Sequence, residues 1–205
     1  LINSADFAGT AGSGWDARFG WGYVNADRAF SQRDAVALVT LTGTSGATPV
    51  RSFERSAAAA TKASAVWNRH VVYQTGGLPT ASALKNVDLR LYSRQSGDLR
   101  ATSASTIDNV EQVVDSNLEA AVLAVTPATS FSSGAEVVAL AHSGGFVERT
   151  GPDVSVSLSA GAQVTAGDTF VLSGAVTNVG DVRGHGFVVT LSLPAGFTLV
   201  QGALT

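Results

Sequence analysis

The sequence predicts an all-β protein, and two observations lead to this fold class. Short runs of β-branched and other apolar residues are separated by turn residues along most of the 205-residue chain, which contains 22 glycines. Several runs also alternate apolar and polar residues, which is the period of a strand with one buried face. In one of them Leu89 and Leu91 alternate with Asp88 and Arg90. We therefore expect antiparallel sheets and little helix.

Residues 1–35 form the first of three differently composed segments. Glycine and aromatic residues punctuate this segment, most densely in GSGWDARFGWGYVNADRAF. Residues 24–30 favour a short helix, and little else there has a regular period. The glycine-rich run GTAGSG, residues 9–14, lacks the Lys-Ser/Thr pair of a phosphate-binding loop. We interpret that run as a plain loop.

Residues 36–150 are predicted to form one β-sandwich of about eight strands. The runs expected to be strands are AVALVTL, KASAVWNRHVVYQ, NVDLRLYS, EAAVLAVT and AEVVALAH. The side chains expected to point into its core are Val66, Leu89, Leu91, Val122 and Val125. Since neighbouring residues of a regular strand face opposite ways, Trp67 then covers an end of the core or follows a bulge.

One stretch of this segment also favours a helix. The run RSFERSAAAATKASAV contains four consecutive alanines, which have high helix propensity, so a helix over residues 57–66 is an alternative. We favour a strand at residues 63–72, because the valines there and Trp67 and Tyr73 beside them are β-branched or aromatic.

Residues 151–205 are predicted to be a second, smaller β unit. The run TGPD, residues 150–153, reads as a linker, and valine or leucine then alternates with serine over residues 154–159. An Ig-like sandwich needs about seven strands and roughly 100 residues, whereas this segment offers about four strands. Such a half-sandwich leaves an apolar face and a strand edge uncovered. We therefore expect it to dock on the first sandwich or on another copy of the chain.

Composition excludes several classes of function. A net charge of −3 gives no electrostatic basis for binding nucleic acid. No apolar stretch reaches the length of about 18 residues that spans a bilayer. The chain contains neither Cys nor Met, position 1 included, so we expect a processed or internal piece of a longer product, without disulfides or thiolate chemistry. Cysteine-free sequence rich in Ser, Thr and Gly is typical of bacterial secreted proteins.

The run GTSGATP, residues 43–49, has the form of a serine-protease nucleophile motif centred on Ser45. A serine nucleophile needs a histidine base that is itself oriented by a carboxylate, and subtilisin-type enzymes carry these residues in the order Asp, His, Ser. The only histidines, His70, His142 and His185, all follow Ser45. Phe53 also stands where a small residue is required behind the serine. We therefore interpret the run as a turn between strands.

Three parts of the chain resemble known families, and they follow one another in the order found in secreted subtilisin-like proteases. LINSADF followed by FGWGYVNADRAF resembles the closing segment of a subtilisin-like catalytic domain, peptidase family S8. KASAVWN, NVDLRLYSRQSG and SASTIDNVEQV resemble strands of the jelly-roll sandwich that many secreted subtilases append, a relative of the P domain and of pre-peptidase C-terminal domains. TNVGDVRGHGFVVTLSLPAGFTLV resembles the Ig-like repeats of bacterial secreted proteins.

The resemblance implies three domains and an accessory function. Residues 1–35 would be the tail of the catalytic domain, residues 36–150 a jelly-roll sandwich, and residues 151–205 a truncated Ig-like domain. The chain would then be a non-catalytic C-terminal region of a secreted serine endopeptidase, supporting its own catalytic domain or engaging protein substrate, and inactive by itself because it lacks the triad. An extracellular adhesive or carbohydrate-binding module is the alternative.

Calcium is the only cofactor that the resemblance leaves open. Related jelly-roll domains often bind it, and the acidic residues of the sandwich are Asp88, Asp98, Asp108, Glu111 and Asp115. Asp88 and Asp108 are the candidate ligands, although no Asp-x-Asp-x-Asp-Gly loop is present and solvated carboxylates explain the set better. The three histidines have no partner at metal-ligand spacing. The sequence therefore assigns no catalytic, cofactor or metal residue.

Overall fold

The structure, a computed structural model, describes residues 1–6, 15–42, 50–131, 134–160, 165–185, 188–193, 195–198 and 200. It is nearly all β, as predicted. Its one described helix is α1 (Ala26–Ser31), close to the expected position, with Asn25 as its N-cap. The strands are β1 (Val36–Thr42), β2 (Arg51–Arg55), β3 (Thr61–Trp67), β4 (Val71–Val72), β5 (Thr80–Ala81), β6 (Val87–Ser93), β7 (Leu99–Ser103), β8 (Val110–Asp115), β9 (Ala121–Pro127), β10 (Ala135–His142), β11 (Val147–Arg149), β12 (Val154–Ser159) and β13 (Ser173–Asn178).

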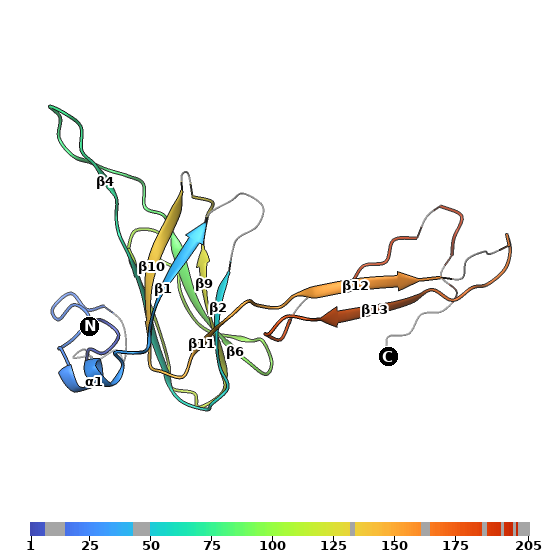
Figure 1. The fold of residues 1–205 in the computed structure, drawn as a ribbon, viewed down its shortest axis with the longest axis horizontal. Coiled ribbons are helices and arrows are strands. Elements are labelled where there is room, and N and C mark those ends of the chain that lie inside the picture. Colours follow the sequence, from blue (N-terminus) through green and yellow to red (C-terminus); the bar gives the residue numbers. More distant parts are fainter. Residues whose placement is uncertain are drawn as a thin grey trace.

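The described residues between positions 36 and 150 form a sandwich with jelly-roll topology (Figure 1). One sheet has the strand order β1-β10-β3-β8 and the other β11-β2-β9-β6-β7, with antiparallel neighbours throughout. The edge strand β11 and the β4–β5 hairpin are additions to this core. When the remaining eight strands are numbered 1 to 8 in chain order, the first sheet has the order 1-8-3-6 and the second has the order 2-7-4-5. This interleaving is that of two Greek keys, so the jelly-roll prediction is confirmed.

The core lies between the two sheets and follows the period-2 pattern of their strands. Leu89 and Leu91 of β6 and Val125 of β9 are fully buried, as predicted. Leu41, Leu123 and Leu140 join them from neighbouring strands. Burying side chains of this size supplies the main stabilisation of the fold, at about 1.5–3 kcal/mol each.

Two of the predicted core residues face outward instead. In β3 the inward positions are Thr61, Ala63, Ala65 and Trp67, so Val66 points to the outer face. In β9, Leu123 points inward and its neighbour Val122 therefore points outward. Trp67 is 2% exposed on a strand in unbroken register with β10, so no bulge intervenes. The larger side chains occupy the core and fix which face the smaller valines take.

The strand interpretation of the alanine-rich stretch is confirmed over residues 61–67, but the expected continuation to residue 72 is wrong, because residues 68–70 are not in a strand and β4 belongs to a separate hairpin with β5. β3 pairs with β10 on one side and β8 on the other, so its backbone groups are hydrogen-bonded within the sheet. A helix over residues 57–66 would lose the hydrogen bonds of β3 to β10 and to β8, and it would also lose the burial of Ala63 and Ala65. Tertiary pairing therefore overrides the local helix propensity of alanine.

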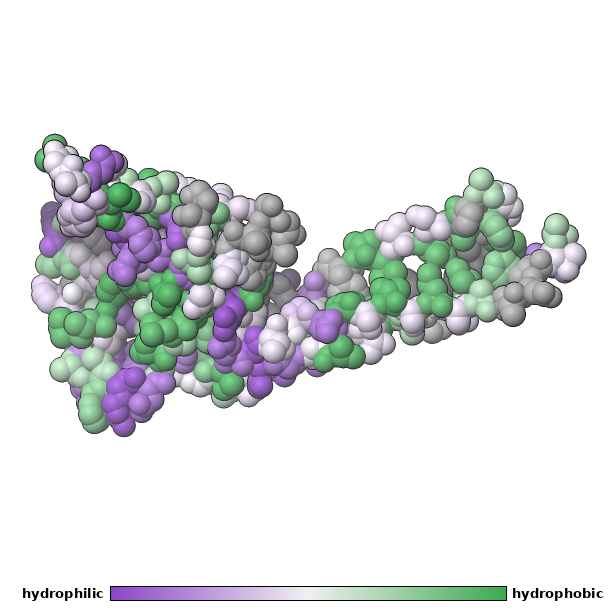
Figure 2. All heavy atoms as spheres, turned by 45° about the horizontal axis from the view of Figure 1, so that its top comes forward, coloured by the Kyte–Doolittle hydropathy of each residue, from purple (hydrophilic) through white to green (hydrophobic). Residues whose placement is uncertain are grey.

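In the described part of the C-terminal unit, residues 151–205, strands β12 and β13 extend away from the sandwich (Figure 1). Its described part contains one two-stranded sheet, β12 paired with β13, where about four strands were expected. Residues 188–193 alternate in sequence as a strand would but form none. Every residue of β12 and β13 is exposed, and Figure 2 shows apolar surface along this unit.

None of the helices in the described part of the chain is long and apolar enough to cross a membrane.

Candidate functional site

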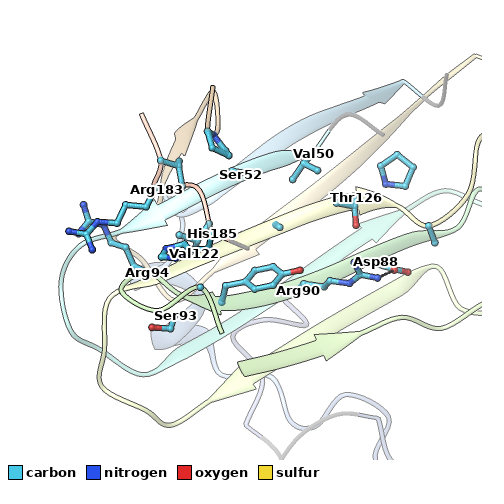
Figure 3. A pocket seen from close by; sticks show the side chains of 17 residues that line it. Val50, Ser52, Asp88, Arg90, Ser93, Arg94, Val122, Thr126, Arg183 and His185 are labelled. Carbon is cyan, nitrogen blue, oxygen red and sulfur yellow. Dashed lines mark hydrogen bonds and ion pairs between the residues drawn. The ribbon is translucent and has the colours of Figure 1, made fainter. Parts of the chain in front are cut away.

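A groove on the outward face of the five-stranded sheet is the candidate site (Figure 3). It encloses about 520 Å³ between strands β2, β9 and β6 on one side and residues 182–185 of the C-terminal unit on the other. We call it the outer groove. Its lining residues include Ser52, Asp88, Arg90, Tyr92, Arg94, Val122, Ala124, Thr126, Val182, Arg183 and His185.

The floor of the outer groove follows from strand alternation. Because Val87, Leu89 and Leu91 of β6 point into the core, Asp88, Arg90 and Tyr92 point to the opposite face. The antiparallel register places these three opposite Thr126, Ala124 and Val122 of β9, respectively. The same alternation that builds the core thus builds a polar stripe flanked by small residues.

Asp88 is the most unusual residue in the outer groove. Its side chain is only 7% exposed, and its Oδ2 accepts a hydrogen bond of 2.8 Å from Nη2 of Arg90. Its other carboxylate oxygen, Oδ1, is buried and, like five other buried side-chain atoms of the described residues, has no partner among those residues. A buried acceptor without a partner costs about 1–3 kcal/mol, and a donor that reached this oxygen would recover that free energy.

Basic side chains gather at the other end of the outer groove. Arg94 and Arg183 lie together there near His185, as Figure 3 shows. Nε of Arg94 donates to the buried carboxylate of Glu54, which also lies 3.9 Å from Nε of Arg149. No described acidic side chain forms an ion pair with Arg183. This end therefore carries surplus positive charge.

Hydrogen bonds hold residues 182–185 over the sheet. The carboxylate of Asp181 accepts from N of Thr150 (3.1 Å), Oγ1 of Thr150 (2.9 Å) and N of Gly151 (3.0 Å). Desolvation opposes ionisation of Asp181, but these hydrogen bonds outweigh it and lower its pKa. Nδ2 of Asn178 also donates to O of Val182 at 2.8 Å, and Val182 is buried. The linker is thus tied to the segment that closes the outer groove.

The five acidic residues proposed as a set are not brought together. Asp88 lies in the outer groove beside a guanidinium, Asp108 accepts from Oγ of Ser105 at 2.7 Å, and Asp115 pairs with Arg100 at 2.5 Å. Over the described ranges, no cluster of three or more His, Cys, Asp or Glu side chains could hold a metal ion. The geometry thus gives the calcium candidates Asp88 and Asp108 separate environments.

Glu111 points into the interior from β8. N of Ser105 donates to its carboxylate at 2.7 Å, and the hydroxyl of Ser103 donates as well. Desolvation raises the pKa of Glu111, helped by the negative charges of Asp88 and Asp108, while the two hydrogen bonds oppose the shift. The residue acts as a buried anchor for the chain that connects β7 to β8.

The three histidines occupy separate places. Nε2 of His70 lies 2.8 Å from Oε2 of buried Glu136, which also lies 3.4 Å from Nζ of Lys85. His142 is buried against the ring of Phe146, and desolvation followed by the charge of Arg55 lowers its pKa. His185 lies at the outer groove. Ser45 and the runs at residues 9–14 and 43–49 lie outside the described residues.

The N-terminal segment contacts the sandwich on its opposite outer face. Nζ of Lys62 donates to O of Ala5 at 2.8 Å, and Oγ of Ser64 donates to Oδ1 of Asn3 at 3.2 Å. Desolvation, with the charge of Arg28, lowers the pKa of Lys62, and Asp6 opposes that shift. Asn3 is 3% exposed, so this contact is a packed interface.

Sequence reasoning missed the outer groove as a site. The alternation of Asp88, Arg90 and Tyr92 was the available signal, and it was used only to predict a strand. Arg183 comes from a different unit and could not be assigned to the same place from spacing alone. Comparisons of the chain with protein-family models and with curated proteins give no match.

Proposed function

We propose that this chain is the non-catalytic C-terminal accessory region of a secreted subtilisin-like serine endopeptidase. The three resemblances in chain order support this proposal, and so does the jelly-roll topology at the place where the resemblance implies one. The parent enzyme would cleave peptide bonds by acylating a serine upstream of this chain.

The packing of residues 1–6 on the sandwich is the observation that carries the proposal. This segment resembles the end of the catalytic domain, and it lies across the outer face of the sheet β1-β10-β3-β8 rather than apart from it. Leu1 and Ile2 line a hollow there with Val66 and Ala139. A sandwich attached through buried hydrogen bonds and apolar contacts can brace the domain that ends in this segment.

The encoding reading frame upstream of Leu1 provides the first test. We expect it to contain the Asp, His-Gly-Thr and Gly-Thr-Ser motifs of a subtilisin-like enzyme. The longer product should hydrolyse casein and react with a fluorophosphonate at the upstream serine, whereas the 205-residue chain should do neither. An upstream frame without these motifs, or labelling at Ser45, would overturn the proposal.

The bracing role has its own test in the longer product. Lys62→Ala removes the donor to O of Ala5 and should lower the temperature at which proteolytic activity is lost, because the interface loosens. Arg69→Ala, an exposed basic residue outside this interface, is the matched control and should leave that temperature unchanged. Equal behaviour of the two variants would remove the support for bracing.

A further inference from the structure

We propose that the outer groove binds an extended peptide with aliphatic side chains and an acidic group at one end. This inference goes beyond the accessory function proposed above and does not depend on it. It rests on an unpartnered buried carboxylate oxygen, a basic end and an aliphatic lining.

Asp88 provides a hydrogen-bond acceptor at one end of the outer groove. Its charge is already balanced by Arg90, whose Nη2 lies 2.8 Å from Oδ2. The remaining oxygen, Oδ1, therefore requires a hydrogen-bond donor and not a full positive charge. A backbone N–H of a bound peptide is such a donor. Thr126 of β9 pairs with Asp88 in the sheet and lines the outer groove beside it.

Arg94 and Arg183 provide hydrogen-bond donors at the other end of the outer groove. Arg94 uses Nε on Glu54, and no described group accepts a hydrogen bond from its terminal nitrogens. Arg183 is exposed, with no ion pair in the part of the chain that the structure describes, and His185 lies beside it in Figure 3. Two guanidinium groups at one place recognise a carboxylate, because the planar fork of arginine matches its two oxygens.

The separation of the two ends fits an extended chain. Asp88 and Arg94 are six residues apart along and just beyond β6, which corresponds to roughly 20 Å at the rise of a β-strand. An extended peptide of about six residues spans that distance. The acidic group of the peptide would lie at Arg94 and Arg183, and a backbone N–H near its other end would reach Asp88.

The lining distinguishes a peptide from an oligosaccharide. Between the two ends the walls include the aliphatic and small residues Val50, Val122, Ala124, Pro152 and Val182, and Pro127 and Ala128 continue the lining beyond Asp88. Tyr92 is the only aromatic ring other than His185 among the lining residues. Valine or leucine side chains gain from contact with such walls, whereas sugar rings favour flat aromatic surfaces.

The test is an NMR titration of the 205-residue chain with designed hexapeptides. The acidic probe alternates valine and glycine and ends in two aspartates, and the control probe ends in two lysines. The acidic probe should shift the amide signals of Asp88, Arg90 and Arg183 in a saturable way, and the lysine probe should bind at least about tenfold more weakly because it meets the arginines with like charge.

Two variants locate the site, and two others serve as controls. Asp88→Ala and Arg183→Ala should each weaken binding by about fivefold or more, since each removes one end of the recognition. The Arg183 residue is itself exposed, so its variant remains informative even if Asp88→Ala perturbs folding. The controls are Arg33→Ala and Asp34→Ala, which remove the same charges as the two site variants. Both residues are exposed and lie far from the groove in sequence, so these variants should bind as the unaltered chain does.

Three results would overturn the proposal. These are no saturable shift with the acidic probe, equal binding of the two probes, or saturable binding of an oligogalacturonate with none of the peptide. The last result would assign the outer groove to an acidic carbohydrate. None of these outcomes bears on the upstream motifs, so this inference and the proposed protease function fail separately.

Discussion

Strands β6 and β12 alternate in sequence in the same way, yet their environments are opposite. In β6, Leu89 and Leu91 are fully buried between two sheets. In β12, Leu158 is 60% exposed, although valine and leucine alternate with serine just as regularly. Alternation therefore predicts a strand and the residues that share a face, but burial also requires a second sheet to cover that face.

The two regions also differ in how they handle charge. The ends of the sandwich contain buried ionic groups that are paired, with Glu136 beside His70 and Lys85 in one cluster and Asp115 beside Arg100 in another. No ion pair is found within the described part of the C-terminal unit. The sandwich pairs the ionic groups of these clusters because it buries them, whereas an exposed ribbon leaves its polar groups to water.

Core truncation should show the largest difference between the regions. Leu89→Ala should lower the free energy of unfolding by about 2–5 kcal/mol, because it removes buried contacts and leaves a cavity. Leu158→Ala should change it by less than about 0.5 kcal/mol, as exposed substitutions do. Urea unfolding followed by far-UV circular dichroism, which reports on the strands of both regions, measures both. Similar losses for the two variants would mean that β12 has a covering partner.

Opposite faces of a single strand should show the next largest difference. Val125→Ala, on the inward face of β9, should destabilise the chain by about 1–3 kcal/mol. Val122→Ala, on the outward face, should cost less than about 1 kcal/mol, because that side chain lies in the outer groove. The same urea measurement applies, and a larger loss for Val122→Ala would reverse the assignment of the faces.

The pH dependence of stability should reveal the buried carboxyl of Glu111. Its pKa is raised above the ordinary value of 4.5, so the unfolded chain ionises first as the pH rises. This group therefore makes the free energy of unfolding fall from about pH 4.5 up to its folded-state pKa and remain level above it. Glu111→Gln should remove that fall in a pH series of urea unfolding, while Glu119→Gln, at an exposed position, should retain it. A rise in stability over the same pH range, abolished by Glu111→Gln, would contradict the sign of the shift.

Self-association should be the smallest effect. The uncovered apolar residues of β12 and β13 are expected to pair weakly between copies, so the mean mass from light scattering should increase with concentration. Val156→Lys should reduce that increase, since it places charge in the middle of the face. Leu99→Lys, at an exposed position of the sandwich, is the control. A concentration-independent monomeric mass would exclude association through this face.

The fold class was predicted from the sequence more accurately than which side chains of each strand point into the core. The runs that became β1, β6, β9 and β10 were recognisable because β-branched and leucine residues dominate them. β2 has the sequence RSFER and was not recognised, since its burial depends on Phe53 and on charged neighbours whose partners lie elsewhere in the chain. Val66 and Val122 were assigned to the wrong face because local sequence cannot decide between adjacent apolar residues.

The outer groove could be predicted only in part. Asp88, Arg90 and Tyr92 share a face by strand geometry alone. Their meeting with Arg183 and His185 depends on the hydrogen bonds of Asp181 with Thr150 and Gly151, which join segments about 30 residues apart. The hydrogen bond from Asn178 to Val182 is local and shapes the same turn. Such long-range contacts leave no signature in the local periodicity from which strands are predicted.

Hydrogen exchange tests most directly the central claim that the sandwich has a closed core and the C-terminal unit does not. In a dilute, monomeric sample, amides of β9 and β10 should exchange only through global unfolding. Amides of β12 and β13 should exchange through local opening, at least about a hundredfold faster. Protection of β12 and β13 equal to that of β9 and β10 in the monomer would contradict the account, because it would require a covered, cooperative C-terminal domain.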